Sequence, residues 1–344
     1  MFLVKYWLVA SFHSHETNLM PDAIPLRFRP LMKQAIWGGR RLADALGKSL
    51  GPNSDYAESW EIVDHGNDQS VVVDGPLKGK TLGELYRDET AWLMGNHWND
   101  LAKTPATFPL LFKFLDCNRV LSVQVHPNDE QGSLLDPPDL GKTEAWVILH
   151  SEPESVIYAG LKPGVDREEL ARHIKAGTTE QALHSFHPEA GDCVFIPAGT
   201  VHALGGGLLV AEIQQSSNTT FRLFDWNRTD ASGRSRPLHI KESLEVTDYD
   251  RGPVDAVVPS VDGNQQRLVD CDKFQLTRMV GGEVTIGGDD RCHLISIIGG
   301  EGKLIYPGGE TTVALGDTIL LPAALSQTQL VLGEATAMRM SPPA

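Results

Sequence analysis

The chain has 344 residues, of which 41% are apolar and 22% are charged. This composition is typical of a folded globular protein and excludes a disordered chain or one built of membrane spans. Acidic residues outnumber basic ones by 45 to 30, and the formal net charge of -15 would repel nucleic acid and anionic membrane surfaces. We therefore expect a small-molecule partner, with no nucleic acid and no membrane.

The four cysteines stand far apart in the sequence and form no C-x-x-C pair. This spacing fits neither a disulfide framework nor a zinc knuckle, so we expect reduced thiols in a cytoplasmic protein. Residues 1–20 contain an apolar run that is too short to span a bilayer. We interpret this segment as a disordered extension. A signal peptide is the alternative, and Met20 offers an alternative start. The cysteines are Cys117, Cys193, Cys271 and Cys292.

The first part of the chain is predicted to be mostly strands. Residues 25–62 contain short aromatic and aliphatic runs separated by glycine and proline, which indicates edge strands and turns. Residues 81–94 carry leucines at helical spacing and predict a short helix. Residues 108–125 then predict two further strands.

The second of these strands contains the sequence LSVQVHP at residues 121–127. Alternate residues of a strand point to opposite faces, so Ser122, Gln124 and His126 share one side and the aliphatic residues share the other. A glutamine and a histidine two residues apart can aim an oxygen and a nitrogen at one point, which suits a divalent metal inside a barrel. The alternative is a half-exposed strand whose polar face meets water.

Another strand is predicted within residues 140–150, where Lys142, Glu144 and Trp146 lie on the same face. A helix follows between the N-cap residue Asp166 and the stop at Gly177. We interpret this helix as an insertion between strands that covers one end of a barrel.

Residues 191–202 have the sequence GDCVFIPAGTVH. It predicts a Gly-Asp turn, an apolar strand, a Pro-Gly turn, and a returning strand that begins at His202. Further on, basic and aromatic residues alternate and would share one face if the strand is regular. These residues are Arg222, Phe224, Trp226 and Arg228.

A repeat of this pattern appears near the C-terminus. Residues 316–324, GDTILLPAA, copy residues 191–199, but the position of His202 is taken by Gln327. We infer two barrels of one type, of which the second has no metal site.

The predicted fold class is mainly β, with two barrels and a small helical insertion. Residues 21–252 would form the first barrel with the insertion, and residues 253–344 the second. Residues 253–262, rich in Pro, Val and Asp, would begin the second domain as an extended linker.

A turn, a Pro-Gly turn and a histidine after a Gln-x-His strand form the pattern of cupin barrels, which are jelly rolls around a metal. Four sequence blocks follow one another along the chain: FKFL at residues 112–115, LSVQVHP, KTE at residues 142–144, and PAGTVHA. This order resembles the type I mannose-6-phosphate isomerases in their short bacterial form, over about residues 25–338. The resemblance implies a zinc enzyme that interconverts mannose 6-phosphate and fructose 6-phosphate through a cis-enediol intermediate.

The resemblance also implies a set of zinc ligands for one Zn2+ per chain. Two imidazoles, one carboxylate and one amide without a thiolate suit a site that keeps positions open to substrate. Taken singly, Glu144 could be a solvated strand residue and His202 a core histidine. The implied ligands are Gln124, His126, Glu144 and His202.

A cluster of basic residues in this acidic chain suits a sugar phosphate, because a phosphate monoester carries roughly -1.5 to -2 charges at pH 7. By resemblance, Ser122, Lys113 and Arg228 lie toward the phosphate. Lys142 would transfer the proton, and Arg222 would stabilise oxyanion charge. The alternative for these basic residues is solvated strand faces, and ordinary surface charge is expected at Arg234, Arg236 and Lys241.

The sequence departs from the family at two positions. Asn218 stands where relatives have an aspartate, and Gly141 stands where longer relatives have a histidine. The first departure leaves open a sugar-phosphate-binding protein with impaired catalysis. A cupin metal dioxygenase is a further alternative, although it would have no need for the predicted phosphate residues. The pattern predicts no particular oligomeric state.

Overall fold

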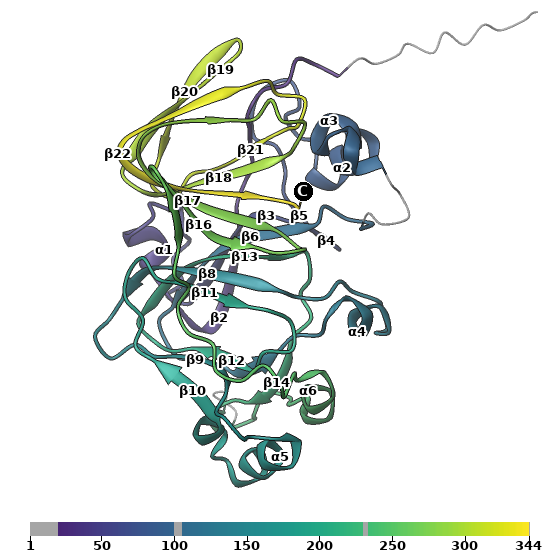
Figure 1. The fold of residues 1–344 in the computed structure, drawn as a ribbon, viewed down its shortest axis with the longest axis vertical. Helices are drawn as coiled ribbons and strands as arrows, with labels where there is room; N and C mark the ends of the chain where they lie inside the picture. The colour runs from purple at the N-terminus through teal and green to yellow at the C-terminus, as the bar shows by residue number, and fades with distance from the viewer. Residues whose placement is uncertain (1–19, 100–104, 230–232, 344) are drawn as a thin grey trace, which may run out of the picture.

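The computed structural model describes residues 20–99, 105–229 and 233–343, and Figure 1 shows its ribbon. Strands make up most of the regular structure in these ranges, and the helices are few and short. The prediction of a mainly β fold is therefore confirmed. The predicted disordered segment, residues 1–20, lies outside the described residues except for Met20.

Two antiparallel sheets form the body that we call the first barrel. Their strand orders are β11-β8-β13-β6-β3-β2 and β10-β9-β12-β7-β14. The six-stranded sheet consists of β2 (Leu31–Gly39), β3 (Tyr56–Ile62), β6 (Leu110–Cys117), β8 (Glu144–Ser151), β11 (Cys193–Ile196) and β13 (Leu208–Gln215). The five-stranded sheet consists of β7 (Val123–Val125), β9 (Ile157–Leu161), β10 (Leu183–Phe186), β12 (His202–Leu204) and β14 (Phe221–Phe224). A short hairpin of β4 (Asp64–His65) and β5 (Asp68–Gln69) stands beside them.

A nine-stranded antiparallel sheet forms the other body, which we call the second barrel. Its strands are β1 (Leu26–Arg27), β15 (Ser260–Asp262), β16 (Gln265–Asp270), β17 (Gln275–Ile286), β18 (His293–Gly299), β19 (Glu301–Tyr306), β20 (Gly309–Ala314), β21 (Thr318–Leu321) and β22 (Thr328–Ser341). The predicted division at residue 253 needs a correction at β1, which pairs with β21. This pairing covers an edge that would otherwise leave backbone groups open.

The six-stranded sheet is buried on both faces, because the second barrel packs against the side that faces away from the first barrel's interior. On β6, Phe112 and Phe114 belong to one apolar cluster with Leu276 of the nine-stranded sheet. Leu115 belongs to the interior cluster of the first barrel, and Lys113 points into the same interior. Each fully buried Phe or Leu side chain contributes about 1.5 to 3 kcal/mol, so this packing holds the two bodies together.

Helices α2 and α3 lie beside the second barrel, and α5 and α6 lie at the opposite end of the molecule (Figure 1). Backbone N–H groups of residues 323 and 324 donate to carbonyls of α3, so this helix is tied to the second barrel. The helices are α1 (Arg41–Asp44), α2 (Leu82–Asp88), α3 (Thr90–Met94), η1 (Asn96–Asn99), α4 (Asp129–Ser133), α5 (Arg167–Ala176), η2 (Thr179–Ala182) and α6 (Ile240–Val246).

Both predicted helices have the caps that their sequences suggest. The segment predicted as one helix at residues 81–94 forms α2 and α3, and Thr81 and Glu84 make a capping box at the start of α2. Helix α5 begins where Asp166 accepts a hydrogen bond from the Glu169 backbone N–H, and it ends at Gly177, whose φ of 70° is left-handed.

Helix α5 packs on the outer face of the five-stranded sheet. The prediction that it covers one end of the barrel is therefore wrong. Leu170 and Ile174 lie in one apolar cluster with Val123 and Val125 of β7. Because these valines point away from the interior, Gln124 between them points inward. The helix therefore holds a strand of the candidate site in place from behind.

The internal repeat appears in the structure as two matching turns. Gly191 and Gly316 have φ angles of 98° and 89°. In each turn the aspartate that follows, Asp192 or Asp317, accepts a hydrogen bond from the backbone N–H three residues earlier, at 2.8 Å and 3.0 Å. Strands β11 and β21 come directly after these turns, as the repeat predicts.

Strand β14 ends at Phe224, so the predicted shared face of Arg222 and Arg228 is wrong. The pairing with β7 shifts register between Arg222 and Phe224. Trp226 and Asn227 then adopt φ angles of 55° and 54°, and this left-handed backbone turns the chain away from the strand direction.

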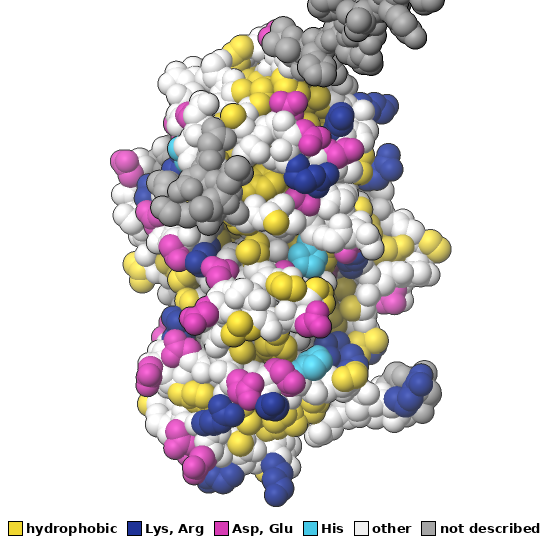
Figure 2. All heavy atoms as spheres, turned by 90° about the vertical axis from the view of Figure 1, so that its right-hand side faces the viewer, with side chains coloured by type: hydrophobic (Ala, Val, Ile, Leu, Met, Phe, Trp, Pro, Cys, Tyr) yellow, Lys and Arg dark blue, Asp and Glu magenta, His cyan; other side chains and the backbone are white. Residues whose placement is uncertain are grey.

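The surface carries mixed charge. Figure 2 shows acidic and basic side chains interspersed with apolar ones over one face of the molecule. Among the described residues, no helix is both long and apolar enough to cross a membrane.

Candidate active site

A cavity of about 360 Å³ opens between the two sheets of the first barrel. Lys113 and Glu212 reach it from the six-stranded sheet, and Gln124, His202 and Arg222 reach it from the five-stranded sheet. Its size falls within the range of small-molecule sites, which is roughly 300 to 1,000 Å³. The two sheets thus bring together residues that lie more than a hundred positions apart in the sequence.

Three of the four predicted ligands form one buried cluster. Ligand atoms of His126, Glu144 and His202 all lie within 4.8 Å of one another, and this is the one such group in the described ranges. His126 Nε2 lies 3.7 Å from one Glu144 oxygen, and His202 Nε2 lies 3.3 Å from the other. This cluster can hold a metal ion.

The orientation of both imidazoles favours metal binding. His126 Nδ1 donates to the Thr219 carbonyl at 2.9 Å, and His202 Nδ1 donates to the Thr200 carbonyl at the same distance. This arrangement assigns the proton to Nδ1 and leaves the Nε2 lone pair for a ligand bond. Burial lowers the pKa of His202 to about 4, and burial with the nearby Lys142 lowers the pKa of His126 well below its usual value. Both rings are therefore neutral at pH 7.

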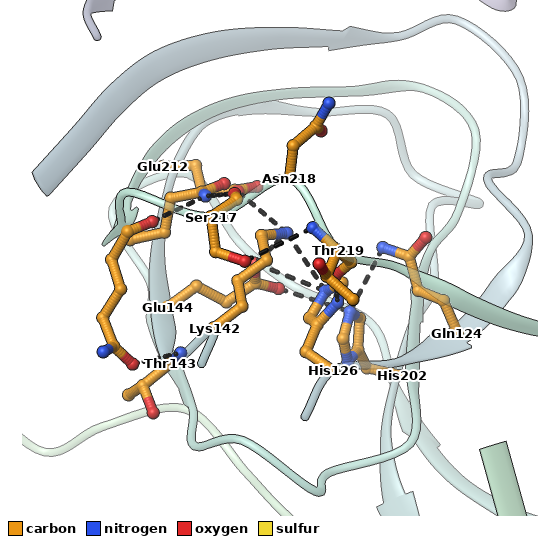
Figure 3. A network of polar contacts seen from close by, with 12 residues as sticks. Gln124, His126, Lys142, Thr143, Glu144, His202, Glu212, Ser217, Asn218 and Thr219 are labelled. Atoms are coloured by element: carbon orange, nitrogen blue, oxygen red, sulfur yellow. Dashed lines mark hydrogen bonds and ion pairs between the residues drawn. The ribbon is translucent and has the colours of Figure 1, made fainter. Parts of the chain in front are cut away.

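The fourth predicted ligand lies next to this cluster. The Gln124 side-chain amide is 3.3 Å from His202 Nε2, and Figure 3 shows it approaching the histidines from the side opposite Glu144. A terminal amide can rotate to present its oxygen in place of its nitrogen. All four side chains therefore fit the predicted set of ligands.

Lys142 lies against the same atoms. Its Nζ is 3.0 Å from His126 Nε2 and 2.7 Å from a Glu144 oxygen. Lys142 thus contacts two of the predicted ligand groups and lies at the edge of the cluster. The Lys142 side chain is 6% exposed.

Glu212 is a buried carboxylate that the sequence analysis missed. It lies 3.2 Å from Lys113 Nζ and 3.7 Å from Lys142 Nζ, and Lys113 also lies 3.3 Å from Glu58. Burial and the charge of Glu144 raise the pKa of Glu212, and the two lysines oppose this shift. Burial alone would lower the pKa of Lys113, but the surrounding carboxylates raise it above its usual value. Lys113 is thus a charged ammonium group that is paired with two carboxylates at one side of the cavity.

Arg222 and Ser122 meet at the cavity wall. Arg222 Nε donates to Ser122 Oγ at 3.2 Å, and another guanidinium nitrogen donates to the Pro237 carbonyl at 3.0 Å. The Arg222 backbone N–H donates to His239 Nδ1, and the His239 backbone N–H donates to the Arg222 carbonyl. The segment before α6 therefore supports Arg222 from outside the sheet.

Arg228 and Arg236 share one carboxylate but occupy different places. Arg228 donates to Asp225 and to the Val120 carbonyl at 2.5 Å each. Arg236 donates to both Asp225 oxygens, at 2.5 and 2.8 Å. Arg236 lines the cavity, and Arg228 is not among its lining residues. The expectation of ordinary surface charge is therefore wrong for Arg236.

The structure describes both residues at which the sequence departs from the family pattern, Asn218 and Gly141. Asn218 lines the cavity beside Thr220, and its side chain is exposed. Figure 3 shows that the Asn218 side chain points away from the histidines. The backbone N–H of Gly141 donates to Asp129 at 2.9 Å.

Comparisons with known proteins agree on one family. The family model for the type I phosphomannose isomerase catalytic domain matches residues 26–142. Mannose-6-phosphate isomerase ManA of Bacillus subtilis is 38% identical over 310 residues, which cover 89% of this chain and 95% of that protein. A mannose-6-phosphate isomerase of Streptococcus mutans is 35% identical over 311 residues, with 89% and 95% covered.

This chain belongs to the type I phosphomannose isomerase family. A crystal structure of mannose 6-phosphate isomerase from Bacillus subtilis matches with a TM-score of 0.82 and 31% identity, over 92% of this chain and 99% of that one. A putative mannosephosphate isomerase from Archaeoglobus fulgidus matches with a TM-score of 0.74 at 21% identity, over 94% and 98%. The second match concerns the fold alone.

In this phosphomannose isomerase, one unpredicted cavity residue, Glu212, has a signal in the sequence, and another, Arg236, has none. Glu212 has the same parity as Gln214 on β13, and it is the one charged residue in an otherwise buried strand. A charge in such a strand indicates a paired or functional group. Arg236 gave no comparable signal, because residues 233–239 form a loop without periodicity.

Proposed function

We propose that the protein interconverts mannose 6-phosphate and fructose 6-phosphate with one zinc ion per chain. The observation that carries this proposal is a cavity lined by arginines and lysines whose wall includes His202 of the buried His-Glu-His cluster, in a chain of net charge -15. Family membership supports the same substrate, because relatives that match over most of their length are named for it.

Zinc is the ion that these ligands suit best. His126, Glu144 and His202 would hold it, with Gln124 as a fourth ligand, and nitrogen and oxygen donors without a thiolate are typical of catalytic zinc sites. When bound, zinc would polarise the sugar oxygens next to the reacting carbons. The neutral imidazoles that the buried environment favours are the form that binds metal.

The phosphate end of the cavity is proposed to include Ser122, Lys113 and Arg236. Arg236 replaces Arg228 in this role, because Arg236 lines the cavity. Arg228 would act from behind by holding Asp225, the carboxylate that also fixes Arg236. Charge-assisted hydrogen bonds to a phosphate are about twice as strong as neutral ones, so this end would select phosphorylated sugars.

Proton transfer is proposed for the pair Lys142 and Glu212, which are 3.7 Å apart. A base takes a proton from one of the two neighbouring carbons and returns it to the other, and a group with a pKa raised toward neutral does this best. Burial and Glu144 shift the pKa of Glu212 in that direction. Lys142 would transfer the proton to or from the oxygen, and Arg222 would stabilise the charge that develops there.

A coupled assay tests this proposal. Mannose 6-phosphate is given to three samples, and the fructose 6-phosphate formed is measured. The samples are the wild-type protein, the same protein after chelator treatment, and the treated protein after zinc is restored. We expect turnover that is lost with the metal and regained with zinc. Binding of mannose 6-phosphate without turnover in the zinc-loaded protein would instead indicate a sugar-phosphate-binding protein with impaired catalysis.

A further inference from the structure

Asp139 lies in the loop between α4 and β8 and contacts the segment that follows β13. One of its oxygens, Oδ2, accepts three hydrogen bonds from three consecutive residues. The donors are Ser217 Oγ at 2.9 Å, the Asn218 backbone N–H at 3.2 Å and Thr219 Oγ1 at 2.7 Å. A single carboxylate oxygen thus joins the three residues of the 217–219 turn, which the Gln214 side chain also contacts at the Ser217 carbonyl.

The other oxygen of Asp139 ties this turn to a different part of the first barrel. Oδ1 lies 3.2 Å from His65 Nε2 on β4 and accepts the Leu140 backbone N–H at 2.8 Å. The Asp139 side chain is only 16% exposed. It is therefore a partly buried anchor whose two oxygens both accept hydrogen bonds.

The anchored turn carries the group that orients His126. The Thr219 carbonyl accepts the His126 Nδ1 proton at 2.9 Å, and Figure 3 shows Thr219 directly beside the two histidines. The matching acceptor for His202 is the Thr200 carbonyl, which belongs to the separate Pro-Gly turn before β12. The contacts of Asp139 therefore lead to one histidine of the cluster and not to the other.

We propose that Asp139 is a positioning residue for the metal site, which fixes the 217–219 turn so that Thr219 holds His126 in its metal-binding orientation. The inference rests on the proposed zinc site and adds a residue outside the cavity wall to it. Removing the carboxylate would leave three loop donors without their acceptor, so the turn would relax and His126 would lose its fixed partner. Loss of an outer partner of a ligating histidine costs roughly 10- to 100-fold in metal affinity or activity.

Zinc affinity by chelator competition tests the proposal in three variants. Asp139→Ala should bind zinc about tenfold more weakly than the wild type. Asp139→Asn should stay within about threefold, because its amide oxygen can still accept the loop donors. Asp192→Ala is the matched control: it also removes an aspartate that accepts a loop hydrogen bond, from the Glu189 backbone N–H, and its zinc affinity should not change.

A second measurement separates positioning from general stability. In the metal-free protein, hydrogen exchange at residues 217–220 should be faster in Asp139→Ala than in the wild type and unchanged in Asp192→Ala. If Asp139→Ala does not fold, the double variant Ser217→Ala with Thr219→Val removes two of the three donors and keeps the Thr219 carbonyl. This double variant should also weaken zinc binding severalfold.

The outcomes distinguish this inference from the proposed function. Wild-type zinc affinity in Asp139→Ala or in the double variant would overturn the role of Asp139 and leave the zinc enzyme intact. Equal zinc loss in Asp139→Ala and Asp192→Ala would also overturn it, since the effect would then be general destabilisation. A wild-type protein that binds no zinc would contradict the proposed function and this inference together.

Discussion

Arg222 lines the cavity and is the residue to which we assign stabilisation of the developing charge. Its guanidinium donates to Ser122 and Pro237, so the side chain is fixed before substrate arrives. If it stabilises charge that develops only along the reaction, Arg222→Ala should lower kcat roughly 100- to 1,000-fold. Zinc content should not change, because Arg222 contacts none of the three clustered ligands.

Measuring kcat and bound zinc on one preparation of this variant checks both statements. A normal kcat would remove Arg222 from the mechanism. Lost zinc would make the residue a structural support of the metal site.

Arg236 allows a test of phosphate recognition. Arg236→Met should lower kcat/KM for mannose 6-phosphate by roughly 10- to 100-fold, because a hydrogen bond to a charged group is worth about 1.5 to 3 kcal/mol. Activity on unphosphorylated mannose should stay the same. Lys241→Met is the control, since the Lys241 side chain is 80% exposed on α6. An equal loss on both sugars would show that Arg236 does not contact the phosphate.

At the scale of single residues, local patterns placed the candidate side chains, and the family resemblance implied that they are metal ligands. Gln124 and His126 share a strand face by their spacing of two, and His202 follows a turn signal that sequence shows directly. Asp139 could not be predicted in the same way, because it contacts residues 78 to 80 positions away through loops. Such contacts depend on how the loops fold over the sheet, and no periodic pattern in the sequence indicates them.

At the scale of elements, regular strands were more predictable than their ends. Lys142 and Glu144 contact each other, as predicted, although β8 begins only at Glu144 and Lys142 precedes it. Beyond Phe224 alternation fails, because two residues with left-handed backbone turn the chain. The result is that Arg228 leaves the cavity wall and Arg236, from the next loop, lies there instead.

The link between β4 and the 134–143 loop should make stability depend on pH. Burial would raise the pKa of Asp139, but hydrogen bonds from His65, Thr219 and Ser217 lower it below its usual value. The hydrogen bond to Asp139 raises the pKa of His65 against the effect of burial, and the nearby Asp68 and Asp64 add to this.

The signs of these shifts define a pH window. The contribution of Asp139 is complete above the usual aspartate pKa of about 4 and is lost as pH falls through the lowered pKa. The contribution of His65 is complete below the usual histidine pKa of about 6.5 and is lost as pH rises through the raised pKa.

His65→Gln should therefore destabilise the protein more at about pH 5.5, inside this window, than at about pH 9. Thermal unfolding at both pH values measures the difference. His184→Gln is the control, because His184 pairs with an Asp255 side chain that is 73% exposed. A stability loss by His65→Gln that is the same at both pH values would contradict the charge-dependent pairing.

At the scale of the whole molecule, the second barrel supports the site without entering it. Phe112 and Phe114 pack against it from the strand that carries Lys113. Lys273, in the loop before β17, lies 2.8 Å from Asp129, which in turn accepts hydrogen bonds from Gly141 and Gln215 beside the cavity. The internal repeat predicted two related bodies. It did not predict that β1 and α3 would join the second one, because their partners lie more than 200 residues away.

The central claim is that one zinc site, in the first barrel, carries isomerisation. The most direct test measures zinc per chain and turnover of mannose 6-phosphate in His202→Ala and in Gln327→Ala, the variant at the matching position of the repeat. We expect His202→Ala to lose both zinc and turnover, because it removes an imidazole from the buried cluster, and Gln327→Ala to keep one zinc and wild-type turnover. Turnover that persists in zinc-free His202→Ala, or zinc that is lost in Gln327→Ala, would contradict it.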